Sequence, residues 1–318
     1  MTNSSWTRAH IGALWGAAYG AVVYPPCPTQ ALAAAGRRCP HAQRERRVVS
    51  LAQFRPEKDH ALQLQAFALF LAGGRGGGGG GGGRRGRRGP PPPSRADAVL
   101  ELIGGVRDAG DEERFAALQV TARELGLEVG KNVVFTPNPP FAYVCARLAT
   151  SLCGLHTMAR EHFGISCVEM QAAGCVVIAH DSGGPQCDIV VPAWRPGGGE
   201  GEGGSSASAS AGARGGYFTG CLARTAEEYA AALGAVFEGG EFDVARMAEA
   251  GRESSGRFSE ESFSEGFCEA VGGLVEEAAG VQVGALAGAG AGAGEGAPAR
   301  REGKGRRGST AGAASGRR

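Results

Sequence analysis

Short apolar runs, several rich in β-branched residues, alternate along this chain with longer segments whose apolar residues recur at helical spacing. The short runs span residues 48–52, 98–103, 133–135, 152–155, 175–180 and 217–222. The helical segments between them span 59–71, 111–125, 141–150 and 164–173, and three more helices follow the last run. Buried strands that alternate with helices are typical of a parallel sheet covered by helices. The sequence therefore predicts an α/β fold with a Rossmann-like sheet of five or six strands.

The helical segments carry their own end signals. Asp59 can cap the first helix, and Gly126 ends the second. Gly174 ends the helix that starts at Gly164, and Thr225 with Glu228 has the spacing of a capping box. Each boundary therefore agrees with the alternation of strands and helices.

Glycine and proline are concentrated outside these elements. The chain has 56 Gly and 16 Pro among 318 residues, and three segments hold most of them: 73–96, 195–216 and 279–318. The first two fall between predicted elements and have too little apolar content to form a core. We expect both to be disordered inserts in the folded domain, and we expect 279–318 to be a low-complexity basic tail.

The overall charge and apolar content exclude several classes of protein. With 33 basic and 32 acidic side chains, the net charge is +1, so no chain-wide field attracts nucleic acid or anionic lipid. No run of 18 apolar residues is present, as a membrane-spanning helix would need. The nine cysteines contain no Cys-x-x-Cys pair, which argues against a disulfide framework or a zinc ribbon.

Two carboxylates and two backbone features come together in the segment 156–191. Glu161 precedes a predicted helix and Glu169 lies within it, so eight steps of about 100° let both face one crevice at the carboxyl edge of the sheet. The helix N-terminus at 163–165 suits a diphosphate, and Gly183-Gly184 lets backbone approach a ligand. Taken singly, such glutamates are usually solvated, and such glycines usually form a turn.

Taken together and in this order, these features resemble the signature of the retaining glycosyltransferases of the GT-B fold: Glu, seven residues and Glu in the C-terminal, donor-binding half. Further segments are similar to the GDP-mannose-dependent α-1,2-mannosyltransferases that extend dolichol-diphosphate-linked oligosaccharides. They are SSWTRAHI, VVYPPC, SLAQFRPEKDHALQLQAF, GLHTMAREHFGI and AHDSGGPQCDIVVP. The resemblance covers about residues 3–275, apart from the two glycine-rich segments.

The resemblance implies a role for each matching residue. Glu161 would contact hydroxyls of the donor mannose, Glu169 would accept hydrogen bonds from the ribose, and Lys58 would meet the diphosphate and help GDP to leave. The backbone N–H groups that complete the phosphate cradle would come from Phe163, Gly164, Ile165, Gly183 and Gly184. We therefore expect Glu161 and Lys58 to be catalytic and the others to bind the donor.

The phosphate clamp departs from the family pattern at one position. Related enzymes often have an arginine five positions before the lysine, where this chain has Gln53, and Arg55 is the nearest replacement. The alternative for Arg55 and Lys58 is a surface ion pair with Glu57 or Asp59. No Asp-x-Asp occurs, so we expect a site without a metal ion or other cofactor, in which GDP-mannose is the donor substrate.

The resemblance also implies a domain organisation. Residues 1–24 would be a remnant of the acceptor-binding half, 25–47 an interdomain linker and 48–278 the GDP-sugar-binding domain. Most of the N-terminal half, with the membrane anchor, would then lie outside this chain. The helix from Ser259 to about Val275 would cross back to that half, and without it Phe258, Phe263 and Phe267 would be partly exposed.

The implied function is transfer of mannose, with retention of configuration, to the dolichol-linked acceptor at the cytosolic face of the endoplasmic reticulum membrane, alone or in a transferase complex. By itself the chain would be soluble and would transfer little, because catalysis needs the acceptor held against the donor. Two alternatives stay open. One is a non-catalytic nucleotide-sugar-binding or interaction module, and the other is a GT-B transferase with a different donor.

Overall fold

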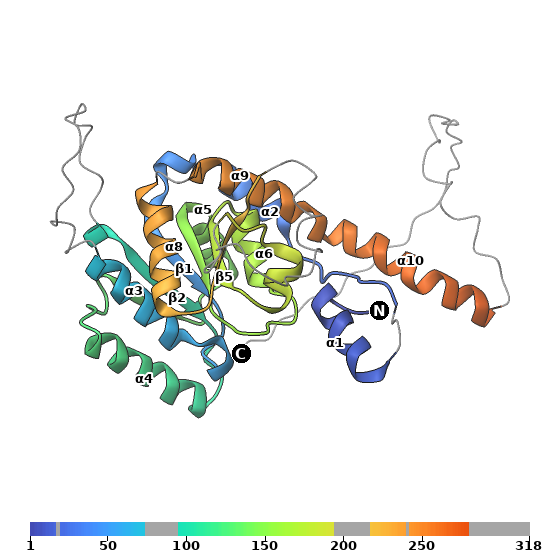
Figure 1. Ribbon diagram of the computed structural model, residues 1–318, viewed down its shortest axis with the longest axis horizontal. Helices are drawn as coiled ribbons and strands as arrows, with labels where there is room; N and C mark the ends of the chain where they lie inside the picture. Colours follow the sequence, from blue (N-terminus) through green and yellow to red (C-terminus); the bar gives the residue numbers. More distant parts are fainter. Residues whose placement is uncertain (17–19, 74–94, 194–216, 240–241, 280–318) are drawn as a thin grey trace, which may run out of the picture. The chain divides into compact units, whose positions relative to one another are not determined.

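The structure is a computed structural model that describes residues 1–16, 20–73, 95–193, 217–239 and 242–279 (Figure 1). Its strands form one parallel sheet in the order β3-β2-β1-β4-β5-β6. They are β1 (Glu45–Leu51), β2 (Val99–Gly104), β3 (Val133–Pro137), β4 (Ser151–His156), β5 (Val176–His180) and β6 (Gly220–Ala223). The predicted Rossmann-like sheet is thus confirmed, with six strands and a reversal of strand order between β1 and β4.

Helices cover both faces of this sheet (Figure 1). One face is covered by α3 (His60–Gly73), α4 (Ala109–Glu124) and α8 (Ala226–Glu238). The other is covered by α2 (Thr29–Arg37), α5 (Phe141–Thr150) and α6 (Ile165–Ala172). The remaining helices are α1 (Ser5–Trp15), α9 (Val244–Ser255) and α10 (Glu260–Ala279), and the short helical turns are η1 (His41–Gln43), η2 (Pro56–Lys58), η3 (Arg95–Asp97), η4 (Pro185–Ile189) and η6 (Gly256–Phe258).

The strands are apolar on both faces because each face is buried under helices. In β1, Val48 joins the core cluster that contains Leu64 and Phe67 of α3. Its neighbour Val49 joins the opposite cluster with Leu148 of α5 and Val168 of α6. Successive strand residues point to opposite faces, so a continuous apolar run is what a strand between two helical layers requires.

Most helix ends follow the predicted signals. Thr225 and Glu228 form the capping box of α8, and Asp59 accepts a hydrogen bond from the backbone N–H of Leu62 at 3.2 Å. The predicted start of α4 at Asp111 is wrong. The helix begins two residues earlier because the Asp108 carboxylate accepts the Asp111 backbone N–H at 2.9 Å.

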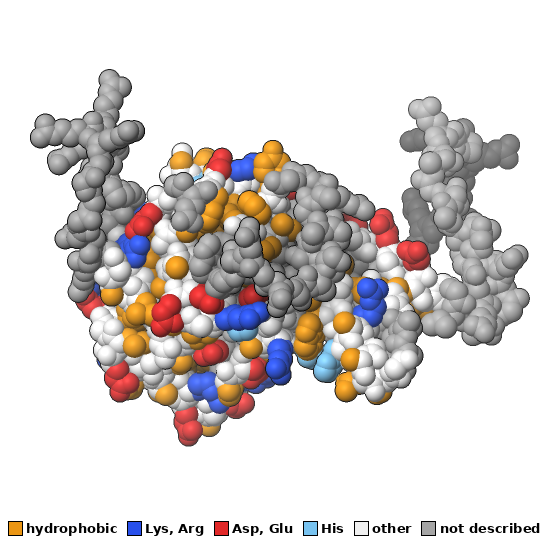
Figure 2. Space-filling view, viewed as in Figure 1, with side chains coloured by type: hydrophobic (Ala, Val, Ile, Leu, Met, Phe, Trp, Pro, Cys, Tyr) orange, Lys and Arg blue, Asp and Glu red, His pale blue; other side chains and the backbone are white. Residues whose placement is uncertain are grey.

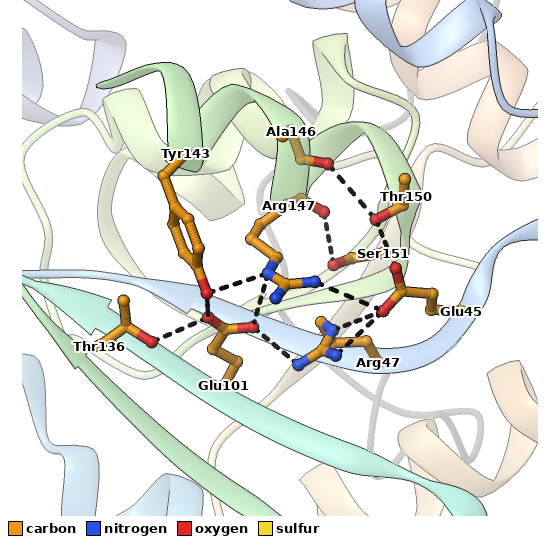
Figure 3. A network of polar contacts seen from close by, with 9 residues as sticks. All are labelled: Glu45, Arg47, Glu101, Thr136, Tyr143, Ala146, Arg147, Thr150 and Ser151. Carbon is orange, nitrogen blue, oxygen red and sulfur yellow. Dashed lines mark hydrogen bonds and ion pairs between the residues drawn. The ribbon is translucent and has the colours of Figure 1, made fainter. Parts of the chain in front are cut away.

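A polar network lies on the sheet face beneath α5 (Figure 3). Glu101 of β2 is fully buried, and its carboxylate accepts hydrogen bonds from Arg47 at 2.7 Å and from Thr136 and Tyr143 at 2.8 Å each. Arg147 of α5 lies 3.4 Å from the same carboxylate. A buried carboxylate is tolerated when charged donors surround it, so this network ties α5 to strands β1, β2 and β3.

An aromatic cluster joins the segment before α2 to the loop before α6. Phe258 is 1% exposed, with its ring edge-on to Tyr24 at 4.9 Å and to Phe163 at 5.2 Å. The prediction that Phe258 is partly exposed is therefore wrong, because two rings distant in sequence cover it. Phe263 is half-buried and Phe267 is 41% exposed, as predicted.

Several predictions fall on residues that the structure does not describe. These are most of the two glycine-rich segments and the tail from residue 280. The chain divides into a unit of residues 1–273 and a unit of residues 274–318, and α10 begins in the first and ends in the second. The predicted domain boundaries remain predictions.

Basic and acidic side chains are interspersed on the face shown in Figure 2, in keeping with the small net charge. Among the described helices, none combines the length and the apolar character needed to cross a lipid bilayer. This face therefore has the mixed charge expected from nearly equal numbers of basic and acidic side chains.

Candidate functional site

A cavity of about 660 Å³ opens at the carboxyl ends of β1, β2 and β4, next to the reversal of strand order. Ligands of open α/β sheets bind at this place, because the loops on either side diverge there. Its lining residues come from five places in the chain: Asn3; Pro25; Leu51, Ala52, Gln53 and Lys58; Gly104 and Gly105; and Glu161, His162, Phe163, Gly164, Ile165, Ser166 and Glu169.

Lys58 and Glu161 meet across this cavity although they lie on different loops. The Lys58 ammonium is 2.6 Å from Glu161 Oε2 and 3.0 Å from the Met158 sulfur. The buried Thr157 hydroxyl donates to the carbonyl of Lys58 at 2.8 Å and accepts from the Gln63 amide at 2.8 Å. The loop after β1 is thus fastened to the end of β4, and Lys58 is held beside Glu161.

Glu161 also faces His156, which the sequence did not single out. His156 is 4% exposed, and its Nε2 lies 3.5 Å from Glu161 Oε2. Burial alone would raise the pKa of Glu161, but the hydrogen bonds and charges of His156 and Lys58 lower it to about 2. Glu161 is therefore ionised at neutral pH and acts as a hydrogen-bond acceptor.

Glu169 has the opposite electrostatic setting. It lies on α6 and lines the same cavity, and burial raises its pKa to about 7. Two carboxylates on one cavity thus differ in protonation near neutral pH. Glu169 is the group whose charge a ligand would alter.

The loop before α6 takes the shape that a helix N-terminus needs. Gly164 has φ of +109°, a conformation that favours glycine, and α6 begins at the next residue. Phe163, Gly164 and Ile165 all line the cavity, where the first backbone N–H groups of a helix favour an anion. The predicted cradle residues of this loop are therefore beside both glutamates.

Gly183 and Gly184 are not among the residues that line the cavity. They pack against the loop that holds Glu161. The Gly184 N–H donates to the Glu161 carbonyl at 2.8 Å, and a Cβ at Gly183 or Gly184 would collide with the backbone of Glu161 or Phe163. The structure thus brings the glycine pair to the back of the site, where it supports the loop.

Arg55 also lies outside the lining. Its guanidinium is 3.8 Å from the Glu57 carboxylate, and both side chains are partly exposed, which matches the alternative of a surface ion pair. For Lys58 that alternative is wrong, because its partner is Glu161 rather than Glu57 or Asp59.

Further lining residues come from places that sequence reasoning passed over. Gly104 ends β2, and a Cβ there would collide with the Ala52 carbonyl, so only glycine lets these two strand ends approach so closely. Asn3 reaches the cavity from the N-terminal segment. A glycine pair directly after a predicted strand was the available signal for Gly104; Asn3 had none.

The N-terminal segment is fastened to the site by α1. The Trp6 indole stacks on the His162 ring at 5.4 Å. The buried Asp188 carboxylate accepts the backbone N–H of Ser5 at 3.0 Å and the hydroxyl of Tyr24 at 2.9 Å. These contacts hold the segments that bring Asn3 and Pro25, on either side of the predicted linker boundary, to the cavity.

The arrangement combines an ammonium, a helix N-terminus, an ionised carboxylate and a carboxyl group near neutrality. The first two favour a diphosphate, and the carboxylates accept hydrogen bonds from hydroxyls. Among the described residues, no three His, Cys, Asp or Glu side chains are grouped as metal ligands. The cavity can therefore hold a ligand that carries a diphosphate and sugar hydroxyls.

Comparison with known proteins agrees with this chemistry. Residues 37–194 match the family Glycosyl transferases group 1. A Xenopus laevis protein named GDP-Man:Man(3)GlcNAc(2)-PP-Dol alpha-1,2-mannosyltransferase is 36% identical over 268 residues, which are 84% of this chain and 47% of that protein. A human protein of the same name is 35% identical over 272 residues, which are 85% and 47% of the two chains. This chain thus spans about half the length of the curated relatives it matches.

Solved structures share the fold. An Anabaena protein, HepE, solved with UDP and glucose, has a TM-score of 0.56 and 18% identity over 85% of this chain and 62% of its own. Sucrose-phosphate synthase from Thermosynechococcus elongatus has a TM-score of 0.57 and 17% identity over 88% and 58%. These likenesses and the parallel sheet show the GT-B type of fold, and the match over residues 37–194 with the named relatives shows that the chain belongs to the group 1 glycosyl transferases.

Proposed function

We propose that this chain is the donor-binding half of a GDP-mannose-dependent α-1,2-mannosyltransferase, which transfers mannose with retention of configuration to a dolichol-diphosphate-linked oligosaccharide. The single observation that carries the proposal is the cavity shared by Lys58, Glu161 and Glu169 at the switch point of the sheet. The names of relatives at 34–36% identity over 84–85% of the chain supply the donor and the acceptor.

In this proposal the donor diphosphate lies between Lys58 and the N-terminus of α6. Lys58 neutralises charge on the leaving GDP, while the backbone of Phe163, Gly164 and Ile165 donates to phosphate oxygens. Glu161, held ionised, accepts hydrogen bonds from the mannose hydroxyls, and Glu169 accepts them from the ribose. Arg55 could contact the diphosphate only after its ion pair with Glu57 is broken.

The same proposal assigns the charge of the diphosphate to protein groups rather than to a metal ion. The Lys58 ammonium already lies in the cavity, where a divalent cation would otherwise be needed. We expect GDP-mannose binding to persist in excess EDTA. A requirement for Mg²⁺ or Mn²⁺ would contradict this part of the proposal.

The acceptor, the membrane and any transferase complex belong to the rest of the enzyme. We place the reaction at the cytosolic face of the endoplasmic reticulum membrane, since the relatives are named for a dolichol-linked acceptor. Retention would proceed on one face of the sugar, with the leaving phosphate helping to deprotonate the acceptor hydroxyl. No carboxylate nucleophile is then required of this chain.

Calorimetric titration of the purified chain tests the donor. We expect GDP-mannose to bind more tightly than UDP-glucose, and we expect Glu161→Ala to weaken GDP-mannose more than GDP, because Glu161 is assigned to the sugar. Glu113→Ala, an exposed change on α4, is the matched control. Equal affinity for GDP-mannose and UDP-glucose would favour another donor.

Turnover with the lipid-linked acceptor separates the donor half from a complete enzyme. We expect transfer by this chain to be weak even when GDP-mannose is bound, because proximity of the acceptor supplies a large part of the rate. Robust transfer would contradict the assignment of the chain as a donor half. Failure to bind any nucleotide sugar would favour an interaction module.

A further inference from the structure

Lys58 has two assignments that one ammonium cannot satisfy fully at the same time. In the structure it contacts Glu161 Oε2 at 2.6 Å, whereas the proposed function gives it the diphosphate. When Lys58 turns toward phosphate, Glu161 loses its strongest partner. A buried carboxylate without a charged donor takes up a proton or moves, and either change spoils its contact with sugar hydroxyls.

His156 is placed to replace Lys58 as the charged partner of Glu161. Its Nε2 lies 3.5 Å from the same Glu161 oxygen that Lys58 contacts. The residue is 4% exposed, so water does not compete for the ring. It stands at the end of β4, where pairing with β5 fixes the backbone and the Tyr229 hydroxyl donates to its carbonyl at 2.9 Å. The backbone that carries the imidazole is therefore fixed on the sheet, and the buried ring stays beside Glu161.

Three groups face the His156 ring. Glu161 on the loop after β4 and Cys167 on α6 favour its charged form, whereas a charge on His180 at the end of β5 opposes it. Burial lowers the pKa of His156, but Cys167 and Glu161 outweigh burial and raise it to about 9. Together with Lys58, a charged His156 gives the Glu161 carboxylate two cationic partners.

We propose that His156 is the positioning residue of the donor site: it keeps Glu161 ionised and oriented toward the sugar when Lys58 turns to the diphosphate. The proposal rests on the proposed function, because it takes the mannose and diphosphate assignments from there. Its distinctive consequence is that His156 affects binding of the sugar and leaves binding of the nucleotide alone unchanged.

Calorimetric titrations with GDP-mannose and with GDP test this consequence. We expect His156→Leu to weaken GDP-mannose about tenfold while GDP affinity stays within a factor of two, because a partly buried carboxylate then loses a charged partner. His156→Gln, which retains an N–H donor, should restore part of the loss. His41→Leu, at the opposite edge of the sheet, is the matched control.

Ring ¹⁵N chemical shifts supply a readout that loss of stability would not move. We expect the imidazole of His156 to stay protonated through pH 8 in the ligand-free chain, and Glu161→Gln to shift its titration to lower pH. Equal weakening of GDP and GDP-mannose in His156→Leu, or a neutral ring at pH 7, would overturn the role of His156 alone. Failure of the unmodified chain to bind either ligand would overturn the proposed function, and this role with it.

Discussion

Glu169 is the residue whose environment most strongly links ligand binding to pH. Burial raises its pKa to about 7, above the ordinary value of 4.5, so the folded chain holds this proton more tightly than the unfolded chain does. Its contribution to stability is therefore fully present below pH 4.5 and is lost as pH rises toward 7. Above pH 7 a buried charge remains that the empty site compensates poorly.

Replacing this carboxyl by an amide should reverse that loss. We expect Glu169→Gln to raise the free energy of unfolding by roughly 2 kcal/mol at pH 8 and by almost nothing at pH 4.5. Urea denaturation at the two pH values measures the difference. Glu113→Gln, exposed on α4, should show no such dependence, and an equal gain at both pH values would contradict a buried charge as the cause.

Gly184 lets the loop that carries Glu161 pack closely against it, because it has no side chain. A Cβ at this position would collide with the backbone of Phe163, so Gly184→Ala has to displace the loop that carries Glu161. We expect a loss of about 1–3 kcal/mol in the free energy of unfolding and weaker GDP-mannose binding. Gly256→Ala, where a Cβ meets open space, should change neither quantity in chemical denaturation and titration.

At the scale of elements, one arginine connects three helix ends on the far edge of the sheet. The buried Arg44 guanidinium donates to the carbonyls of Leu148 at the end of α5 and of Ser151, and of Gly36 in α2. It also donates at 2.5 Å to the carbonyl of Ala173, the C-cap residue of α6. A cation at helix C-termini satisfies carbonyls that lack an intrahelical partner.

Removing this connection should lower stability without touching the site. We expect Arg44→Met to reduce the free energy of unfolding by about 3 kcal/mol, because several buried carbonyls lose their donor together. GDP-mannose affinity of the folded protein should stay unchanged, since the cavity lies at the opposite edge. The exposed Arg38→Met is the control, and a large change in affinity with Arg44→Met would show that the two edges are coupled.

The helices and strands could be predicted because the pattern of apolar residues within each segment indicates which faces are buried. Strands covered on both faces appear as continuous apolar runs, and α5 has the predicted bounds of Phe141 and Thr150. Ends that depend on one side chain were less accurate, as Asp108 shows for α4. The prediction for Phe258 was wrong because the burial of this side chain depends on Tyr24 and Phe163, which no local pattern connects to it.

The candidate site likewise has features that the local sequence predicts and features that depend on the three-dimensional fold. The spacing of Glu161 and Glu169 is local, and the structure places both on one cavity. The meeting of Lys58 with Glu161 depends on the sheet, and the part played by His156 depends on that meeting. A lone histidine after a strand is usually a core residue, so only the three-dimensional arrangement distinguishes it.

For the molecule as a whole, ligand binding should appear as added stability. With GDP-mannose at 100 times its dissociation constant, we expect the free energy of unfolding to rise by about 2.7 kcal/mol. Hydrogen exchange should slow most in the loops after β1, β2 and β4, and least near Arg44 at the far edge. Uniform slowing over the whole sheet would argue against a site confined to the carboxyl edge.

The order of the strands also indicates when the cavity can form during synthesis of the chain. β1 and β2 each pair with the strand that follows directly in sequence, whereas β4 returns to pair with β1, and Lys58 and Glu161 are 103 residues apart. During synthesis, strands β1, β2 and β3 can therefore pair before the residues that complete the cavity have been added. Nascent chains that end before Glu161 lack part of the cavity lining, so we expect ligand binding only after β4 and α6 have been added.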